Sequence, residues 1–145
     1  MKVNIKKLSE NAIIPTYGSP YAAGAELYAC LDTGVVIQPG ETKLIKTGIA
    51  IELPVGYGGF IYARSGLASK RGLAPANKVG VVDCDYRGEV MVALHNHSLN
   101  AEEVLPGERI AQLVIAPYIT AEFEEAEALS DTQRGNGGFG STGRK

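Results

Sequence analysis

The sequence predicts an all-β domain in a barrel or jelly-roll-like arrangement of mostly antiparallel strands with one short helix. Short apolar runs recur along the 145 residues, and clusters of turn-forming residues separate them. Glycine is abundant, with 18 residues, and tryptophan is absent, a composition that suits strands and turns. Only the stretch 65–72 has the pattern and the ending of a helix. About eight to ten strands joined by short turns favour a barrel or jelly roll over a helical fold.

The composition limits the classes of function. A chain of 145 residues is long enough for one domain with a single core. The net charge of −2, from 16 acidic and 14 basic side chains, provides no basic field, so nucleic acid is not an expected partner. No apolar run approaches the ~20 residues that span a bilayer, so no membrane is expected.

The cysteine usage and the N-terminus indicate where the protein resides. The N-terminus lacks the apolar segment of a secretory signal. The two cysteines, Cys30 and Cys84, lie far apart in the sequence and form no Cys-x-x-Cys motif. We expect both to be reduced thiols in a cytoplasmic protein. His95 and His97 have no cysteine partners at zinc-site spacing, so they are assigned a structural role. We therefore expect a cytoplasmic protein, or one of the host nucleus if the source is viral or eukaryotic.

The first half of the chain predicts strands between turns rich in proline and glycine. The first strand carries lysines on one side, as an exposed edge strand does. The strand that begins at residue 43 is broken by Gly48 and then alternates apolar residues at Ile49, Ile51 and Leu53. A short segment at 23–29 consists mainly of small residues around Glu26. The predicted strands cover 2–8, 35–37, 43–53 and 59–63.

The predicted helix follows a strand exit at Arg64 and ends at Gly72, a residue typical of helix C-caps. Arg64, the hydroxyl of Ser65 and the free N–H groups of the first turn could bind an anion together. An equally weighted interpretation is that Ser65 is a plain N-cap and that Arg64 points into solvent.

The stretch 80–91 predicts a β-hairpin, with residues 81–82 entering, residues 90–94 leaving and residues 85–88 in the bend. Two carboxylates, a tyrosine and an arginine lie close together around this bend. Turns usually carry small polar residues, so a tyrosine and an arginine there indicate a further role. The alternative is a solvated turn whose tyrosine covers a neighbouring strand.

The C-terminal part leaves several interpretations open. Gln112 lies in the apolar strand 109–117, where it either has buried partners, whose absence would cost ~1–3 kcal/mol, or faces water. Residues 121–129 are acidic and form either a last short strand or a solvated segment. Residues 134–145 contain two arginines, two hydroxyl side chains and one aromatic among five glycines. Such a tail is either a disordered terminus or a flap over a phosphorylated, ring-bearing ligand.

Five of these segments, in order, resemble the trimeric dUTPase family. The resemblance implies a homotrimer of β-clip, jelly-roll-like subunits with active sites at the subunit interfaces. In that arrangement residues 1–129 form the β-barrel domain, and residues 130–145 form a flexible arm that closes over an active site. The segments are 23–29, 63–68, 80–90 (Gly-Val-Val-Asp-Cys-Asp-Tyr-Arg-Gly-Glu-Val), 107–113 and 134–143.

The resemblance implies a reaction in which dUTP and water give dUMP and pyrophosphate with Mg²⁺ on the triphosphate. This reaction limits uracil incorporation into DNA and supplies dUMP. Asp83 matches the carboxylate that activates the water for in-line attack on the α-phosphorus. Asp85 is then a structural turn residue, because Asp83 already matches the catalytic position.

The resemblance also assigns the binding residues. The uracil and deoxyribose contacts are Asn77, Gly80, Tyr86, Met91 and Phe139. The phosphate contacts are Arg64, Ser65, Gly66, Gln112, Arg134, Ser141 and Thr142. No direct protein ligand to Mg²⁺ is implied, and Glu26 and Gln112 are expected to reach it only through water. The family usually carries aspartate where this chain has Glu26, so the metal dependence is expected to differ.

Two other functions compete with this one. A dCTP deaminase, or its bifunctional relative, resembles dUTPase in fold, but the Arg-Ser-Gly segment and the glycine-rich tail fit the hydrolase better. A non-catalytic, dUTPase-like protein could instead bind a regulatory partner and use nucleotide as a switch. Asp83 and the complete tail argue against lost activity.

Overall fold

The computed structural model describes residues 1–138, which form twelve strands and one helix. Every strand pairing in this part of the chain is antiparallel. The predicted all-β fold with one short helix is therefore confirmed. The elements are β1 (Asn4–Lys7), β2 (Thr16–Tyr17), β3 (Ala25–Tyr28), β4 (Val35–Ile37), β5 (Thr42–Lys46), β6 (Ile49–Glu52), β7 (Tyr57–Tyr62), α1 (Ser65–Arg71), β8 (Leu73–Pro75), β9 (Gly80–Val82), β10 (Met91–Asn96), β11 (Glu102–Val104) and β12 (Arg109–Pro117).

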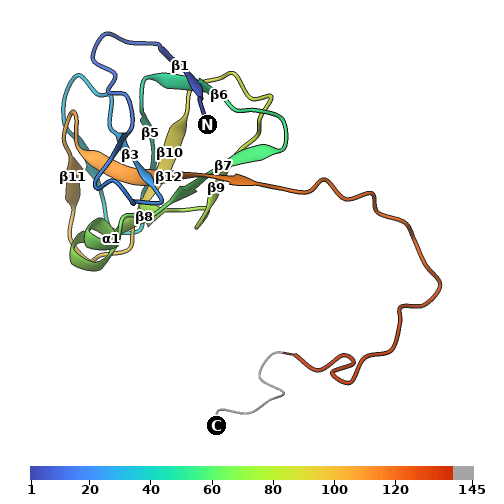
Figure 1. Cartoon of the computed structure of the whole chain (residues 1–145). Coiled ribbons are helices and arrows are strands. Elements are labelled where there is room, and N and C mark those ends of the chain that lie inside the picture. Colours follow the sequence, from blue (N-terminus) through green and yellow to red (C-terminus); the bar gives the residue numbers. More distant parts are fainter. Residues whose placement is uncertain (139–145) are drawn as a thin grey trace.

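The strands form a body of small sheets from which the C-terminal segment departs (Figure 1). The largest sheet has five strands in the order β2-β3-β12-β7-β9, and a second sheet has the order β5-β10-β8. Two further pairs, β1-β6 and β11-β4, complete the body. One apolar core lies among these sheets, and β10 shows how it forms, since Val92 and Leu94 alternate into it. The largest fully buried apolar side chains are Leu27, Ile37, Ile45, Ile49, Leu73, Leu94 and Ile110.

The predicted hairpin at residues 80–91 is wrong in its strand pairing. β9 pairs with β7, whereas β10 pairs with β5 on one side and β8 on the other. Because β10 has a partner on both sides, it offers no free edge to β9. Gly59 faces Val82 across the β7–β9 ladder, and a Cβ there would lie 3.3 Å from Cβ of Val82, so this glycine allows the close approach. The chain at residues 83–90 therefore crosses from one sheet to another.

The helix is as predicted, and it resolves one of the open alternatives. Gly72 ends α1 with a left-handed φ of 66°, and its N–H donates to the carbonyl of Ala68 at 3.1 Å. Arg64 occupies the N-cap position, and Ser65 is the first helical residue. The alternative that Ser65 is the N-cap is therefore wrong.

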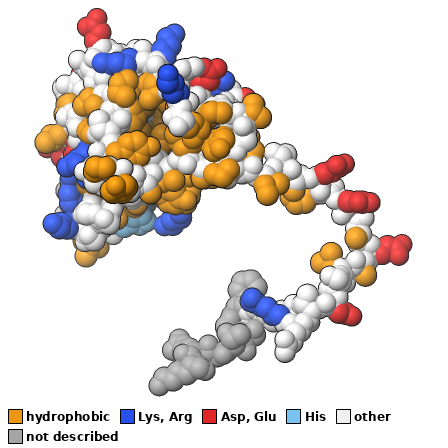
Figure 2. Space-filling view, in the orientation of Figure 1, with side chains coloured by type: hydrophobic (Ala, Val, Ile, Leu, Met, Phe, Trp, Pro, Cys, Tyr) orange, Lys and Arg blue, Asp and Glu red, His pale blue; other side chains and the backbone are white. Residues whose placement is uncertain are grey.

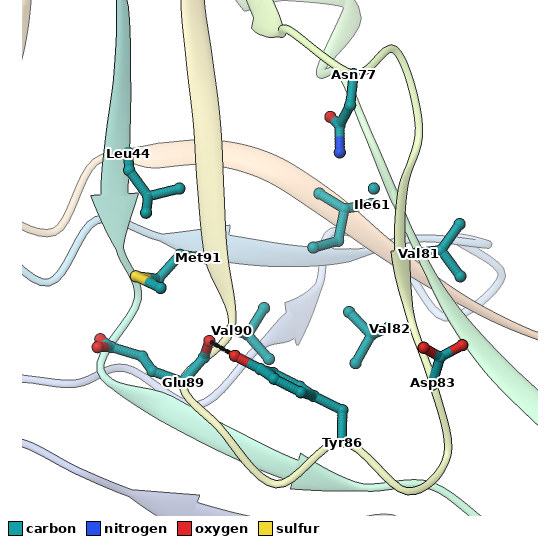
Figure 3. Close-up of a pocket in the computed structure, with 11 residues that line it drawn as sticks. Leu44, Ile61, Asn77, Val81, Val82, Asp83, Tyr86, Glu89, Val90 and Met91 are labelled. Carbon is teal, nitrogen blue, oxygen red and sulfur yellow. Dashed lines mark hydrogen bonds between the residues drawn. The ribbon is translucent and has the colours of Figure 1, made fainter.

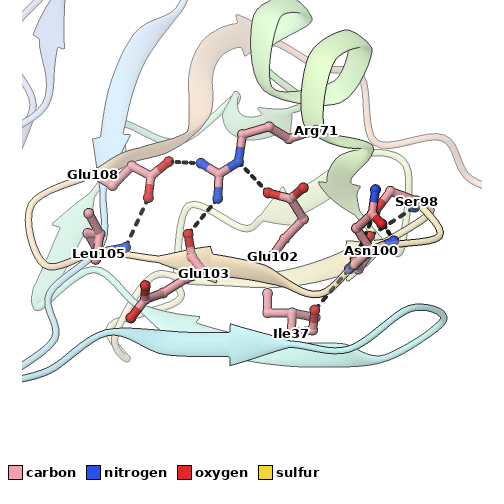
Figure 4. Close-up of polar contacts among 9 residues, drawn as sticks. Ile37, Arg71, Ser98, Asn100, Glu102, Glu103, Leu105 and Glu108 are labelled. Atoms are coloured by element: carbon pink, nitrogen blue, oxygen red, sulfur yellow. Dashed lines mark hydrogen bonds and ion pairs between the residues drawn. The ribbon is translucent and has the colours of Figure 1, made fainter.

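Arg71, in the last turn of α1, ties the helix to the body (Figure 4). Its Nε donates to Oε2 of Glu102 at 2.6 Å, and its two terminal nitrogens donate to the Glu108 carboxylate and to the carbonyl of Glu103. These charged partners raise the pKa of Arg71 despite its partial burial. The C-terminal end of the helix is thus held against β11 and the turn that precedes β12.

Replacing Gly72 by alanine is expected to lower stability without altering the helix start. The left-handed conformation costs a non-glycine residue about 1–2 kcal/mol. A Cβ there would also lie 2.9 Å from the backbone nitrogen of Ser98. The matched control is Gly66→Ala inside α1, where a Cβ meets nothing within 4 Å and alanine favours the helix. A melting temperature that falls equally in both variants would contradict this account.

The segment after β12 leaves the body and forms no strand or helix up to residue 138 (Figure 1). The expected alternative of a last strand at 121–129 is therefore wrong, because these residues find no pairing partner. The side chains of Ile119 and Phe123 are 94% and 96% exposed. Figure 2 shows acidic side chains along this segment and apolar side chains gathered on the face of the body near its exit. No helix in residues 1–138 is long and apolar enough to cross a membrane.

Candidate active site

A pocket of about 240 Å³, here called the turn pocket, lies between β9, β10 and the crossing at residues 83–90 (Figure 3). Five residues that the sequence assigned to catalysis or to the nucleoside line it together: Asn77, Gly80, Asp83, Tyr86 and Met91. They come from four parts of the fold, the β8–β9 turn, the start of β9, the crossing and β10. The remaining lining residues are Leu44, Ile61, Val81, Val82, Glu89 and Val90.

Tyr86 is fixed at one end of the turn pocket by the backbone around it. Its hydroxyl donates to the carbonyl of Glu89 at 2.9 Å, and its backbone N–H donates to the carbonyl of Asp83 at 3.1 Å. Gly88 lets the ring lie flat across the turn, because a Cβ at Gly88 would lie 2.6 Å from Cζ of Tyr86. Glu89 is anchored in turn, since its Oε1 accepts from the N–H of Gly48 at 2.8 Å. A rigid aromatic surface therefore closes this end of the pocket.

Asp83 lies at the rim of the turn pocket, directly after β9. Its side chain is exposed, and within residues 1–138 it has no hydrogen bond or ion pair. The next residue, Cys84, contacts the hydroxyl of Tyr118 with its Sγ at 3.4 Å, which raises the pKa of Tyr118. Because the Asp83 carboxylate has no partner in residues 1–138, it can accept a hydrogen bond from water or from a ligand.

The opposite end of the turn pocket is formed by Asn77 and Gly80. The amide of Asn77 points toward Ile61 in the pocket interior (Figure 3). A Cβ at Gly80 would lie 3.2 Å from Cβ of Ile61, so glycine lets the backbone approach β7 closely here. Lys78, between them, has a φ of 64°, which is strained for a side-chain-bearing residue. The turn therefore presents backbone groups and one amide to the same space.

A second pocket of about 110 Å³, the arginine pocket, is lined by Glu26, Arg64, Ser65, Gly66 and Gln112. Glu26 on β3 lies opposite Gln112 on β12, and Gln112 lies opposite Tyr62 at the end of β7. The pairing of β12 with β3 and with β7 thus brings Glu26, Gln112 and the start of α1 together. Gln112 has a partner, since its Nε2 donates to the carbonyl of Ala63 at 2.8 Å.

Arg64 already has an anionic neighbour. Its Nε lies 2.6 Å from Oε2 of Glu26, and its Nη1 donates to the carbonyl of Arg109 at 3.2 Å. The Glu26–Arg64 ion pair does not have hydrogen-bond geometry, because Oε2 of Glu26 is buried without a hydrogen-bond partner among the described residues. The alternative in which Arg64 simply points into solvent is therefore wrong. The arginine pocket contains a guanidinium, an exposed hydroxyl at Ser65 and open space above Gly66.

The two pockets share no lining residue, so the predicted site residues among the described part of the chain fall into two separate groups. Arg134 lies in the departing segment, where its Nε donates to the carbonyl of Gly137 at 2.8 Å, and it contacts neither pocket. Phe139, Ser141 and Thr142 lie outside the described residues.

Sequence reasoning missed several residues of these sites. Leu44 and Ile61 line the turn pocket from β5 and β7, and Arg109 approaches Glu26, with 3.9 Å between its Nη1 and Oε1 of Glu26. No local motif marks these residues, because their positions depend on the register of strands that are distant in sequence. Glu89 also lines the turn pocket, and it lies inside the segment 80–90 that resembles the family. A charged residue directly before the apolar Val90 was the one local feature that could have drawn attention to it.

The family model of dUTPase matches residues 10–143 of the chain. The chain belongs to the dUTPase family. A deoxyuridine 5'-triphosphate nucleotidohydrolase of Nautilia profundicola is 54% identical over 144 residues, which cover 99% of this chain and 100% of that protein. A protein of the same name from Hydrogenobaculum is 52% identical over 145 residues, and the match covers 100% of this chain and 100% of that protein. The prediction of this family from five segments is confirmed.

Solved dUTPase structures have the same fold. The dUTPase of Staphylococcus bacteriophage 80alpha with dUPNHPP is 31% identical, has a TM-score of 0.89, and the match covers 98% of each chain. The same phage enzyme without a named ligand has a TM-score of 0.81 and 29% identity, over 90% of this chain and 99% of that one. The jelly-roll-like prediction for the subunit of this dUTPase is thus confirmed.

Proposed function

We propose that this dUTPase hydrolyses dUTP to dUMP and pyrophosphate by attack of an Asp83-oriented water on the α-phosphorus. The observation that carries the proposal is the turn pocket, where the Asp83 carboxylate, unpaired within residues 1–138, lies beside the Tyr86 ring and the Asn77 amide. The names of the relatives, deoxyuridine 5'-triphosphate nucleotidohydrolases, support the same reaction.

In the proposed mechanism Asp83 accepts a hydrogen bond from the attacking water and takes up its proton as the new P–O bond forms. The bond between the α-phosphorus and the bridging oxygen breaks in line with this attack, and pyrophosphate departs. Phosphoryl chemistry of this kind depends on positioning and on charge stabilisation rather than on a covalent intermediate. Asp83 suits the role because none of the described side chains competes for its oxygens.

The nucleoside occupies the turn pocket in this proposal. Asn77 and the backbone at Gly80 read the uracil edge, and Met91 packs beside the base. A donor and acceptor set that fits uracil leaves polar groups unpaired against cytosine. Tyr86 lies under the deoxyribose, where its fixed ring leaves no room for a 2′-hydroxyl.

The arginine pocket is the proposed phosphate site, with contacts from Arg64, Ser65, Gly66 and Gln112. A guanidinium and a hydroxyl are donors, and both suit phosphate oxygens. Binding must then draw Arg64 away from Glu26, because the two groups are paired in the free chain. The arm completes the site, with phosphate contacts from Arg134, Ser141 and Thr142 and with Phe139 stacked on the uracil.

We infer that Mg²⁺ is the metal and that it is held mainly by the triphosphate. Residues 1–138 contain no cluster of three or more carboxylate, histidine or cysteine side chains that could bind a metal ion. Oε2 of Glu26 is buried and, although paired with Arg64, accepts no hydrogen bond from the described residues, so it suits a hydrogen bond from a metal-bound water. Gln112 lies opposite Glu26. Bound there, the ion would neutralise charge on the phosphates.

A homotrimer with active sites at the subunit interfaces is part of the proposal. The turn pocket and the arginine pocket are lined by different residues of the chain, which supports a site built from more than one subunit. The exposed Ile119 and Phe123 on the departing segment are available for contact with another subunit. The division into a domain at 1–129 and an arm at 130–145 belongs to the same proposal.

The proposed reaction is tested by pyrophosphate release from dUTP, dCTP, dTTP and UTP with Mg²⁺. We expect turnover of dUTP alone. The groups at Asn77 and Gly80 that read uracil should reject nucleotides with another base, and Tyr86 should reject the 2′-hydroxyl of UTP. Ammonia release from dCTP would show a deaminase instead. No turnover of any nucleotide by a well-folded protein would favour a nucleotide-binding regulator, comparable to the phage dUTPases that control transfer of virulence genes by a G protein-like mechanism.

Replacing Glu26 by aspartate is expected to lower the Mg²⁺ concentration needed for half-maximal activity. The shorter side chain is expected to weaken the 2.6 Å contact between Oε2 of residue 26 and Nε of Arg64, which leaves the carboxylate more available to metal-bound water. A shift of roughly threefold or more is reasonable, because such outer contacts change metal affinity or activity by about 10–100-fold. The shift is measured in Mg²⁺ titrations of turnover and, by calorimetry, of the binding of a non-hydrolysable dUTP analogue. An unchanged Mg²⁺ response would contradict the role of Glu26.

A further inference from the structure

Arg87 holds the backbone of the crossing at residues 83–90 from outside the turn pocket. Its Nη1 donates to the carbonyl of Cys84 at 2.6 Å and to the carbonyl of Tyr86 at 3.1 Å. Its Nη2 donates to Oε1 of Glu52 at 3.3 Å. The guanidinium therefore spans two carbonyls of the crossing and one carboxylate of β6.

Glu52 is in turn held by the first strand. Asn4 on β1 lies opposite Glu52 on β6, and Nδ2 of Asn4 donates to Oε2 of Glu52 at 2.8 Å. The hydrogen bond from Asn4 and the charge of Arg87 keep the pKa of Glu52 below its ordinary value, so it is ionised at neutral pH. The chain of contacts runs from β1 through β6 to the crossing, and Arg87, Glu52 and Asn4 are here called the clamp.

The clamp does not belong to the substrate pocket. Arg87 is absent from the lining of the turn pocket and instead borders a separate hollow over β1 and β6, together with Asn4 and Glu52. A direct substrate contact therefore does not explain it. The two carbonyls that Arg87 binds belong to Cys84 and Tyr86. They lie in the same part of the crossing as Asp83 and Tyr86, the residues proposed to orient water and to lie under the sugar.

We propose that Arg87 is a positioning residue which, supported by Glu52 and Asn4, sets the places of Asp83 and Tyr86 and thereby the selectivity for deoxyribose. The inference rests on the proposed roles of those two residues. A lysine could not replace Arg87, because one ammonium group cannot match the planar guanidinium that reaches the Cys84 and Tyr86 carbonyls and Glu52 at once.

An ordinary surface ion pair is the competing explanation, since the Arg87 and Glu52 side chains are each 52% exposed. Exposed pairs contribute little to stability. The two explanations differ in what the substitutions change. An ordinary ion pair affects at most the melting temperature, whereas a positioning role changes the preference for dUTP over UTP.

The experiment compares Arg87→Lys and Glu52→Gln with the wild-type protein, using kcat and KM for dUTP and for UTP. Glu41→Gln is the matched control, because Glu41 also accepts one hydrogen bond, from the N–H of Gln38 at 2.7 Å, and pairs with one cation, Lys43, at 3.5 Å. Hydrogen exchange of the peptide that covers residues 83–90 reports directly on the backbone. The melting temperature of each variant shows whether it is folded.

Arg87→Lys is expected to lower the ratio of kcat/KM for dUTP to that for UTP by about 10-fold, since small misplacements of catalytic groups cost up to about 10²-fold. Glu52→Gln is expected to lower it by a smaller factor, and both variants should speed exchange at residues 83–90. Glu41→Gln should match the wild-type protein in every measurement.

An unchanged dUTP preference in folded Arg87→Lys would overturn the inference, as would a loss equal to that of the Glu41→Gln control. Failure of the proposed function gives a different result. If Asp83→Asn or Tyr86→Ala kept full activity and selectivity, the roles of those residues would be wrong whatever the clamp variants showed.

Discussion

Replacing Asp83 by asparagine is expected to abolish dUTP hydrolysis while leaving the fold intact. The amide cannot take up a proton from water, and general bases of this kind contribute about 10²–10⁴-fold to rates. The Asp83 side chain is exposed and has no partner among the described residues, so its charge does not support the fold. Pyrophosphate release measures the loss, and the melting temperature and the affinity for a non-hydrolysable dUTP analogue show that folding and binding persist.

Asp85→Asn is the matched control for this prediction. Asp85 is exposed, lies two residues further along the same crossing, and does not line the turn pocket. The same chemical change there is expected to keep most of the activity. Equal losses in both variants would indicate a general effect of charge in the crossing and would contradict a specific role for Asp83.

Mixing two inactive variants is expected to restore activity. Asp83→Asn disables the turn pocket and Arg64→Ala disables the arginine pocket, and these pockets are separate on one chain. In a trimer that mixes the two chains, an active site at an interface can take its Asp83 from one subunit and its Arg64 from another. With equal amounts and random assembly, about a quarter of such sites would contain both native residues.

The mixing experiment requires the chains to be unfolded and refolded together, or expressed together, because subunits of a stable trimer do not exchange freely. Each variant alone, treated in the same way, is the control. Recovery near a quarter of wild-type activity would support shared sites. No recovery by trimers shown to contain both chains would mean that each site uses one chain, contrary to the proposal.

Much of the candidate site could be predicted from the sequence because its residues lie in short continuous segments. Asn77, Gly80, Asp83, Tyr86 and Met91 fall within fifteen positions of the chain, and the structure places all of them around one pocket. Their catalytic and binding roles stay predictions. The helix was also predictable, because its ending at Gly72 depends on a left-handed residue that the local sequence specifies.

The strand pairing could not be predicted in the same way. The local pattern at residues 80–91 favoured a hairpin, yet β9 pairs with β7 and β10 lies between β5 and β8. Local turn residues report on whether a chain can reverse, but the partners of a strand depend on which edges are free in the assembled sheets. For β10 both edges are occupied, so the hairpin was excluded by residues distant in sequence.

The sequence by itself determined the strand-rich fold, the single helix and the segments that bear the chemistry, because these depend on local composition and periodicity. The tertiary structure decided which of those segments meet. It separated the turn pocket from the arginine pocket, paired Glu26 with Arg64, and placed Arg87 between the crossing and Glu52. These contacts join residues up to 38 positions apart, as for Glu26 and Arg64, and only the register of antiparallel strands brings such residues together.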